Sequence, residues 1–120
     1  MEIHFSSRKI QKVCNSEKAM RAAFGRPLAE RLQQRLAELQ AAETLDDISR
    51  LPPARCHELS QDRKGQLAVD LVHPKRLIFE PDHNPLPRKP DGGLDWSHVT
   101  SICVLGPVHT TVSHQRSMRS

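Results

Sequence analysis

Apolar residues recur at helical spacing through the first third of the chain and alternate with polar residues through most of the remainder. A short leading run, in which Ile3 and Phe5 flank His4, predicts a strand. The stretch from Ile10 to Phe24 has helical spacing and fits either one broken helix or two short ones. After Pro27, leucines follow at intervals of four, four and three, which predicts an amphipathic helix of roughly 15 residues packed antiparallel to the first helical stretch.

The period changes to two after the Pro52-Pro53 pair, which we expect to end a short helical turn. The prolines and glycines of residues 81–95 predict a loop. Gly106 and Pro107 are expected to end the last strand, because proline cannot donate to a sheet. Polar turns separate the predicted strands, which cover residues 56–59, 66–71, 76–80 and 99–105.

Helices followed by strands indicate an α+β fold, with the helices on one face of the sheet. The other face is expected to be half open and to carry arginine, lysine and histidine side chains. A length of 120 residues allows one domain. We assign it to residues 1–108 and expect residues 109–120 to form a flexible tail.

The charge and composition of the chain limit the kinds of partner and the cellular location that we expect for this protein. The formal net charge is +4, and residues 1–35 hold eight basic and three acidic side chains, a balance of +5. A basic face of this kind favours a polyanion such as nucleic acid as a partner, although a solvated surface would also carry such a charge. No apolar run of about 18 residues occurs, so no membrane partner is expected. Three scattered cysteines and the lack of a secretory signal pattern predict a cytoplasmic protein with reduced thiols.

Three segments together resemble the RelE/ParE toxin superfamily, and most closely its HigB-like branch of plasmid-maintenance killer proteins. They are His57-Glu58-Leu59, the basic hairpin at residues 62–66, and Arg76-Leu77-Ile78-Phe79-Glu80. The resemblance implies a RelE-like fold, in which an N-terminal strand and a two-helix hairpin pack on a curved antiparallel sheet of three or four strands. It also implies the toxin of a type II toxin–antitoxin system that cleaves translated mRNA on the ribosome. Its partners would be a HigA-like antitoxin, the ribosome with its mRNA, and operator DNA for the toxin–antitoxin complex.

RNA cleavage without a metal requires a base for the ribose 2′-hydroxyl, an acid for the leaving oxygen and a cation for the phosphorane. The resemblance implies an endoribonuclease that uses no metal and no cofactor. We expect His57 and Arg76 to lie on neighbouring strands, on the open face of the sheet. The resemblance assigns Arg76 to the phosphate and Arg63 and Lys64 to the RNA backbone, and we add Lys75 to the residues expected to bind RNA. For proton transfer we expect His57 and His109, because the pKa of an unperturbed imidazole lies near physiological pH.

Other interpretations stay open at this stage. Arg76 could instead pair with Glu58 or Asp70 across strands. The chain contains no tyrosine, whereas the family usually ends in a segment with tyrosine and histidine. The missing tyrosine and the Gly106-Pro107 pair favour a homologue that only binds its antitoxin. A gyrase-inhibiting toxin of the ParE type is a further alternative.

Overall fold

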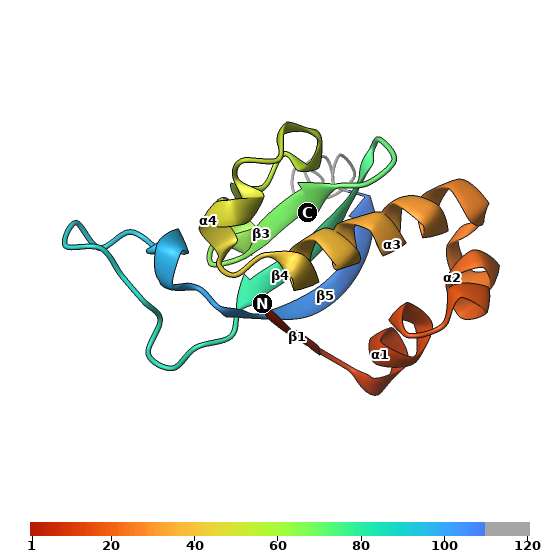
Figure 1. The fold of residues 1–120 in the computed structure, drawn as a ribbon, viewed down its shortest axis with the longest axis horizontal. Coiled ribbons are helices and arrows are strands. Elements are labelled where there is room, and N and C mark those ends of the chain that lie inside the picture. Colours follow the sequence, from red (N-terminus) through yellow and green to blue (C-terminus); the bar gives the residue numbers. More distant parts are fainter. Residues whose placement is uncertain (110–120) are drawn as a thin grey trace.

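The computed structural model describes residues 1–109, and these form four helices and five strands (Figure 1). The predicted α+β class is confirmed. Three short 3₁₀ turns, which we label η1 to η3, span Pro52–Ala54, Gln61–Arg63 and Trp96–His98. In chain order the helices and strands are β1 (Glu2–Phe5), α1 (Arg8–Cys14), α2 (Glu17–Phe24), α3 (Arg26–Ala41), α4 (Leu45–Ile48), β2 (His57–Glu58), β3 (Leu67–Asp70), β4 (Lys75–Pro81) and β5 (Ser101–His109).

The sheet is mixed, with the strand order β1-β5-β4-β3-β2. The four strands that follow the helices, β2 to β5, pair antiparallel, as predicted. The N-terminal strand β1 joins β5 in parallel, so the sheet has a fifth strand and is mixed rather than purely antiparallel. Parallel neighbouring strands need a long crossover connection, which a tight turn cannot supply. The long segment between β1 and β5 provides such a connection. The helices α1 to α3 follow β1 directly and begin that crossover.

The first helical stretch is two helices, which decides between the two predicted alternatives. The hydroxyl groups of Ser7 and Ser16 each accept a hydrogen bond from a backbone N–H in the first turn of α1 and α2, respectively. Gly25 alone separates α2 from α3. α2 packs against α3, whereas α1 packs against α2 and β1 (Figure 1). The predicted antiparallel helix pair is therefore a chain of three helices. No helix within residues 1–109 is long and apolar enough to cross a membrane.

The core lies between α3 and one face of the sheet. Leu32 and Leu39 of α3 are buried, as predicted, whereas Leu36 is only half-buried. The strands contribute alternate residues to this core, as period-two alternation requires: Leu67, Val69, Leu77, Phe79, Ile102 and Val104. On the opposite face Ala68 and Ile78 are buried as well, so the face predicted to be half open is closed to solvent at its centre.

The last strand continues through Gly106 and Pro107, so the predicted break was wrong. Pro107 is the Cα partner of Leu77 in β4. β1 pairs with β5 only as far as Val104, so beyond that residue β5 has no second neighbour that would need the missing proline N–H. Gly106 has a φ of +126°, beside an irregularity in the β4–β5 register, and a Cβ there would lie 3.2 Å from Cδ1 of Ile10. β5 reaches His109, and residues 110–120 of the predicted tail lie outside the described residues.

Candidate functional site

Arg76 lies in a row of charged side chains that runs from β4 across β3 to the segment before β2. Asp70 of β3 is its Cα partner, and Asp70 Oδ1 lies 3.6 Å from Arg76 Nε. Asp70 Oδ2 lies 3.4 Å from Nε of Arg55, which precedes β2. Arg55 has a left-handed backbone, with a φ of 49°, and lies outside the paired residues of β2, so its side chain makes this contact without strand pairing. One carboxylate thus lies between two guanidinium groups.

This row borders a pocket of about 190 Å³ at the turn between β3 and β4. The Arg76 side chain is 32% exposed and that of Arg55 is 70% exposed, so both can reach a ligand from solvent. Lys75 adds a third cation, while Asp70 is the single acidic residue of the lining. The pocket therefore has an excess of positive charge, which suits a phosphate or another anion.

Of the two predicted cross-strand partners of Arg76, Asp70 is the one that the structure brings to it. Glu58 instead accepts a hydrogen bond from Nε1 of Trp96, at 2.8 Å. The Arg76–Asp70 pair is too long for a strong charge-assisted hydrogen bond, for which about 2.7–2.9 Å is usual. Arg76 therefore keeps donors for a further acceptor.

The prediction that His57 and Arg76 lie on neighbouring strands is wrong, because β3 lies between β2 and β4. The spacing of strands puts their Cα atoms roughly 12 Å apart. Nδ1 of His57 lies 2.8 Å from the backbone oxygen of Arg55. A carbonyl oxygen can only accept, so Nδ1 carries the proton and the neutral ring has Nε2 available as a base.

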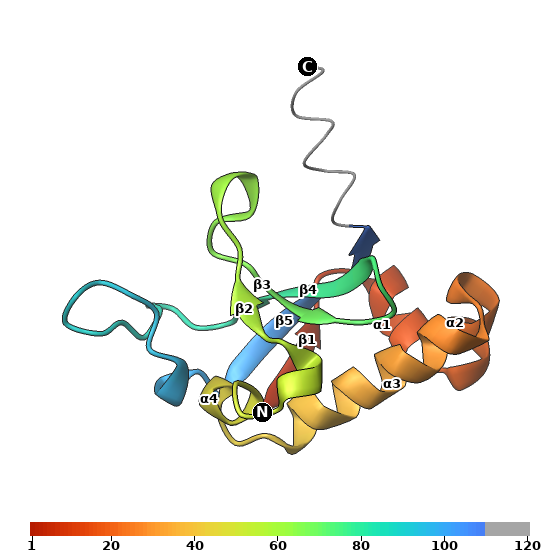
Figure 2. The ribbon, with the colours of Figure 1, turned by 90° about the horizontal axis from the view of Figure 1, so that it is seen from above.

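The other predicted site residues fall into two groups. Arg63 and Lys64 lie in the hairpin between β2 and β3, which projects on the side of the sheet away from α3 (Figure 2). Lys75 begins β4, and its Cα partner is His109. The hairpin and the start of β4 are at opposite ends of β3, so the structure separates Arg63 and Lys64 from Arg76 by the length of that strand, about 13 Å. The structure describes only the backbone of His109.

Arg35 of α3 is a buried cation that the sequence reasoning missed. It is 1% exposed. Its Nε donates to the backbone oxygen of Asp70 at 2.6 Å, and its second terminal nitrogen, Nη2, donates to the backbone oxygen of Pro53 at 2.8 Å. Nη1 pairs with Glu38 at 3.0 Å. Arg35 therefore ties the end of β3 and the chain before Arg55 to the same point of α3.

A signal in the sequence was present for Arg35, one of the two arginines that the sequence reasoning missed. Arg35 lies three residues after Leu32 and four before Leu39, on the stripe that faces the core, and an arginine there has to find buried acceptors. Arg55 has no such signal, because its backbone is left-handed and it precedes β2, so strand alternation does not place its side chain.

A metal or a thiol nucleophile has little support. Within residues 1–109, no three histidine, cysteine or acidic residues are grouped so that they could hold a metal ion. Burial raises the pKa of the Cys56 thiol to about 12, with a smaller contribution from Glu58. Burial also raises the pKa values of Cys14 and Cys103. All three cysteines therefore remain protonated at neutral pH.

A serine, a histidine and an aspartate also meet at η3, but they do not form a catalytic triad. Nδ1 of His98 lies 2.8 Å from Asp95 Oδ2 and 3.2 Å from the hydroxyl of Ser97. A triad needs the acid and the nucleophile on opposite ring nitrogens, whereas here both contact Nδ1. The Ser97 hydroxyl donates to Asp95, and this bond is the main reason why the pKa of Asp95 is lowered. This cluster caps a turn.

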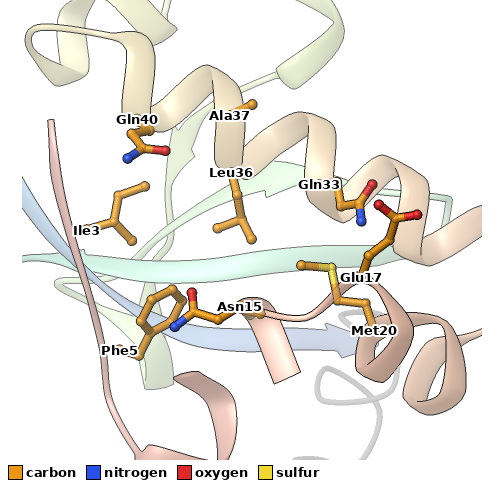
Figure 3. Close-up of a pocket in the computed structure, with 10 residues that line it drawn as sticks. Ile3, Phe5, Asn15, Glu17, Met20, Gln33, Leu36, Ala37 and Gln40 are labelled. Atoms are coloured by element: carbon orange, nitrogen blue, oxygen red, sulfur yellow. The ribbon is translucent and has the colours of Figure 1, made fainter. Parts of the chain in front are cut away.

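A second and larger hollow, of about 400 Å³, lies between β1, α2 and α3 (Figure 3). Ile3, Phe5, Met20 and Leu36 line it with apolar side chains, and Glu17 is its one charged residue. It lacks the paired acids, bases or cations that would support catalysis. Of these two hollows, the pocket beside Arg76 is the better candidate site.

A comparison of the chain with known protein families and with curated proteins found no match.

Proposed function

We propose that this protein is the toxin of a type II toxin–antitoxin system, has a RelE-like fold and cleaves mRNA on the ribosome. The observation that carries the proposal is the pocket beside Arg76, where two arginines and a lysine line a solvent-accessible hollow with a single carboxylate. The order of strand, helices and antiparallel strands also agrees with the resemblance stated above. The proposed site of action is the cytoplasm, with a HigA-like antitoxin as the partner that neutralises the toxin.

In this proposal Arg76 binds the scissile phosphate and stabilises the phosphorane, because its planar group matches two phosphate oxygens. Nε2 of His57 accepts the proton of the ribose 2′-hydroxyl, and the 2′-oxygen attacks phosphorus while the bond to the 5′-oxygen breaks. The leaving 5′-oxygen requires a proton, for which His109 is the candidate. Its backbone lies opposite Lys75, and Arg76 follows Lys75 in β4.

Arg63 and Lys64 would hold the RNA backbone at the far end of β3. A chain running along β3 would contact both ends, so the separation of the two basic groups is compatible with an extended single strand. The ribosome would supply the remaining alignment of the mRNA.

One alternative loses part of its support. The expected break at Gly106 and Pro107 favoured a homologue that only binds its antitoxin, but β5 is continuous there. The missing tyrosine is what still favours it. Nothing in the described residues favours a gyrase inhibitor.

Expression of the protein without an antitoxin tests the proposal. We expect growth arrest, with new cuts in a translated mRNA that primer extension detects. Arg76→Ala should reduce cleavage by about 10²-fold or more, the usual effect of removing a group that stabilises a transition state. Arg26→Ala is the matched control, because this arginine is exposed and pairs with Glu30 on its own helix. No arrest, or the same cuts in Arg76→Ala, would contradict the proposal.

A further inference from the structure

The relation of Asp70 to the two arginines is unusual for a site that should attract an anion. The pocket contains one acidic side chain, and this side chain lies between the cations rather than at the rim. The Asp70 side chain is 28% exposed and is reached by the same solvent-filled space as Arg76. An anion that entered the pocket would therefore meet Asp70 as a competitor for the same donors.

The two ion pairs leave most of the arginine donors unused. Each guanidinium approaches Asp70 through Nε, at 3.4 Å for Arg55 and 3.6 Å for Arg76. Within residues 1–109, neither side chain has another hydrogen bond or ion pair. The terminal nitrogens of both arginines are thus available to an anion with several acceptor oxygens.

The backbone around Asp70 is fixed more firmly than its side chain. Arg35 binds its carbonyl oxygen from inside the domain, and β4 pairs with it from the side. Arg35 also binds the carbonyl of Pro53, two residues before Arg55. The two chain segments that carry Arg55 and Asp70 therefore keep their positions when the carboxylate changes its partners.

We propose that Asp70 is a built-in counter-ion, which occupies the place of a phosphate group between Arg55 and Arg76 until the ligand arrives. Arg55 is then a second phosphate-binding residue of this site. In the empty protein the carboxylate offsets the repulsion between two nearby guanidinium groups. In the complex, phosphate oxygens take over their terminal nitrogens, and the negative charge of Asp70 weakens binding. That the phosphate belongs to an RNA chain rests on the proposed function. The replacement of Asp70 by a phosphate between the two arginines does not rest on it.

The direction in which one substitution changes RNA affinity tests this proposal. Asp70→Asn keeps the size of the side chain and removes its charge, so it should tighten binding of a short single-stranded RNA about three- to tenfold at low salt. Asp46→Asn removes the same charge elsewhere, because Asp46 of α4 forms an exposed pair with Arg50, which follows the helix. This control should leave the affinity nearly unchanged. Fluorescence anisotropy with a labelled RNA hexamer measures both, and thermal unfolding verifies that both variants are folded.

Arg55→Ala should change RNA affinity in the opposite direction. It should weaken binding of the same RNA about three- to tenfold, while Arg50→Ala should not. In the native chain, Asp70→Asn releases two arginines for the ligand. In the Arg55→Ala variant it releases only Arg76, so the gain in RNA affinity from Asp70→Asn should be smaller there. If Asp70→Asn weakens binding or leaves it unchanged in a folded protein, Asp70 positions the arginines instead of competing with the ligand, and the inference is wrong.

Inorganic phosphate as a second probe separates this inference from the proposed function. Tighter binding of both phosphate and RNA by Asp70→Asn, in a protein that cuts no mRNA, would support the counter-ion and reject the toxin. Tighter binding of RNA alone would support the counter-ion for a diester within a chain. Cleavage of mRNA by a protein in which Asp70→Asn binds RNA no better would support the toxin and reject the counter-ion.

Discussion

The two ends of β3 carry basic side chains in different ways. At the end that leads to β4, Arg76 and Arg55 share one carboxylate, and a buried arginine from α3 holds the backbone beneath it. At the hairpin end, the Arg63 side chain bonds to Gln66, three residues along the chain, at 3.1 Å. No ion pair involves the hairpin arginine or its neighbour Lys64 within residues 1–109.

The two ends of β3 therefore differ in how firmly their basic side chains are held, and this suits them to different roles. Contacts between distant segments fix the positions of charged groups, and a chemical step that depends on direction needs such positions. Exposed residues on a local turn attract a polyanion without fixing its orientation. The pocket end of β3 is thus suited to bind one phosphate group, and the hairpin end to hold a chain.

The largest expected effect comes from the buried contact at the pocket end. Arg35→Met removes the donor to the backbone oxygens of Asp70 and Pro53 and also removes the ion pair with Glu38, which keeps its hydrogen bond from Gln34. We expect the free energy of unfolding to fall by about 3 kcal/mol, since buried acceptors lose their hydrogen bonds. Urea unfolding measures the change. Arg31→Met, on the half-buried side of the same helix, is the control, and an equal loss in both variants would contradict a special role for Arg35.

The second expected effect is a dependence of the free energy of unfolding on pH, caused by Cys56 next to the pocket. Partial burial of the Cys56 thiol, with a smaller contribution from Glu58, raises its pKa from the ordinary 9.0 to about 12 in the folded protein. The folded state therefore favours the protonated thiol, so this stability is complete below the unfolded pKa and is lost as the pH rises from about 9 towards about 12. Cys56→Ala should lose less stability than the native protein between about pH 8 and about pH 10.5. Urea unfolding at both values checks this, and equal losses would count against burial of the thiol.

A smaller effect is expected at the turn of the hairpin. Gly65 has a φ of +93°, and no heavy atom lies within 4 Å of the position that a Cβ would occupy. Gly65→Ala should therefore lower the free energy of unfolding by about 1 kcal/mol through backbone strain alone. Ser60→Ala in the same hairpin is the control. Anion binding at the other end of β3 should not change, and a change there would show that the two ends are coupled.

The smallest effect on stability is expected from the hairpin charges. The double substitution of Arg63 and Lys64 by alanine should change the free energy of unfolding by less than about 0.5 kcal/mol. It should reduce the slope of RNA affinity against salt concentration by about 1.4, or 0.7 for each phosphate that is no longer neutralised. Binding measured over a series of salt concentrations gives the slope. An unchanged slope would exclude the hairpin from the RNA interface.

The sequence predicted elements better than their arrangement. The α3 helix followed from the spacing of its leucines, and the faces of β4 followed from alternation, because both patterns are local. Strand order does not have a local signal, so the expectation that His57 and Arg76 are neighbours was wrong. The strand break at Gly106 and Pro107 was also wrong, since the rule against proline applies only where the missing N–H would face a neighbour.

The amino-acid sequence by itself determined the α+β class, the helix that forms the core with the sheet, and the basic residues at positions 63, 64, 75 and 76, because periodicity and charge are properties of short segments. Only the tertiary structure decided that Arg55 and Arg76 share Asp70 and that Arg35 fixes the backbone beneath them. Those contacts join residues from α3, from the segment before β2, and from β3 and β4. Their partners depend on strand order and on the depth of burial, which are set by the packing of the whole domain.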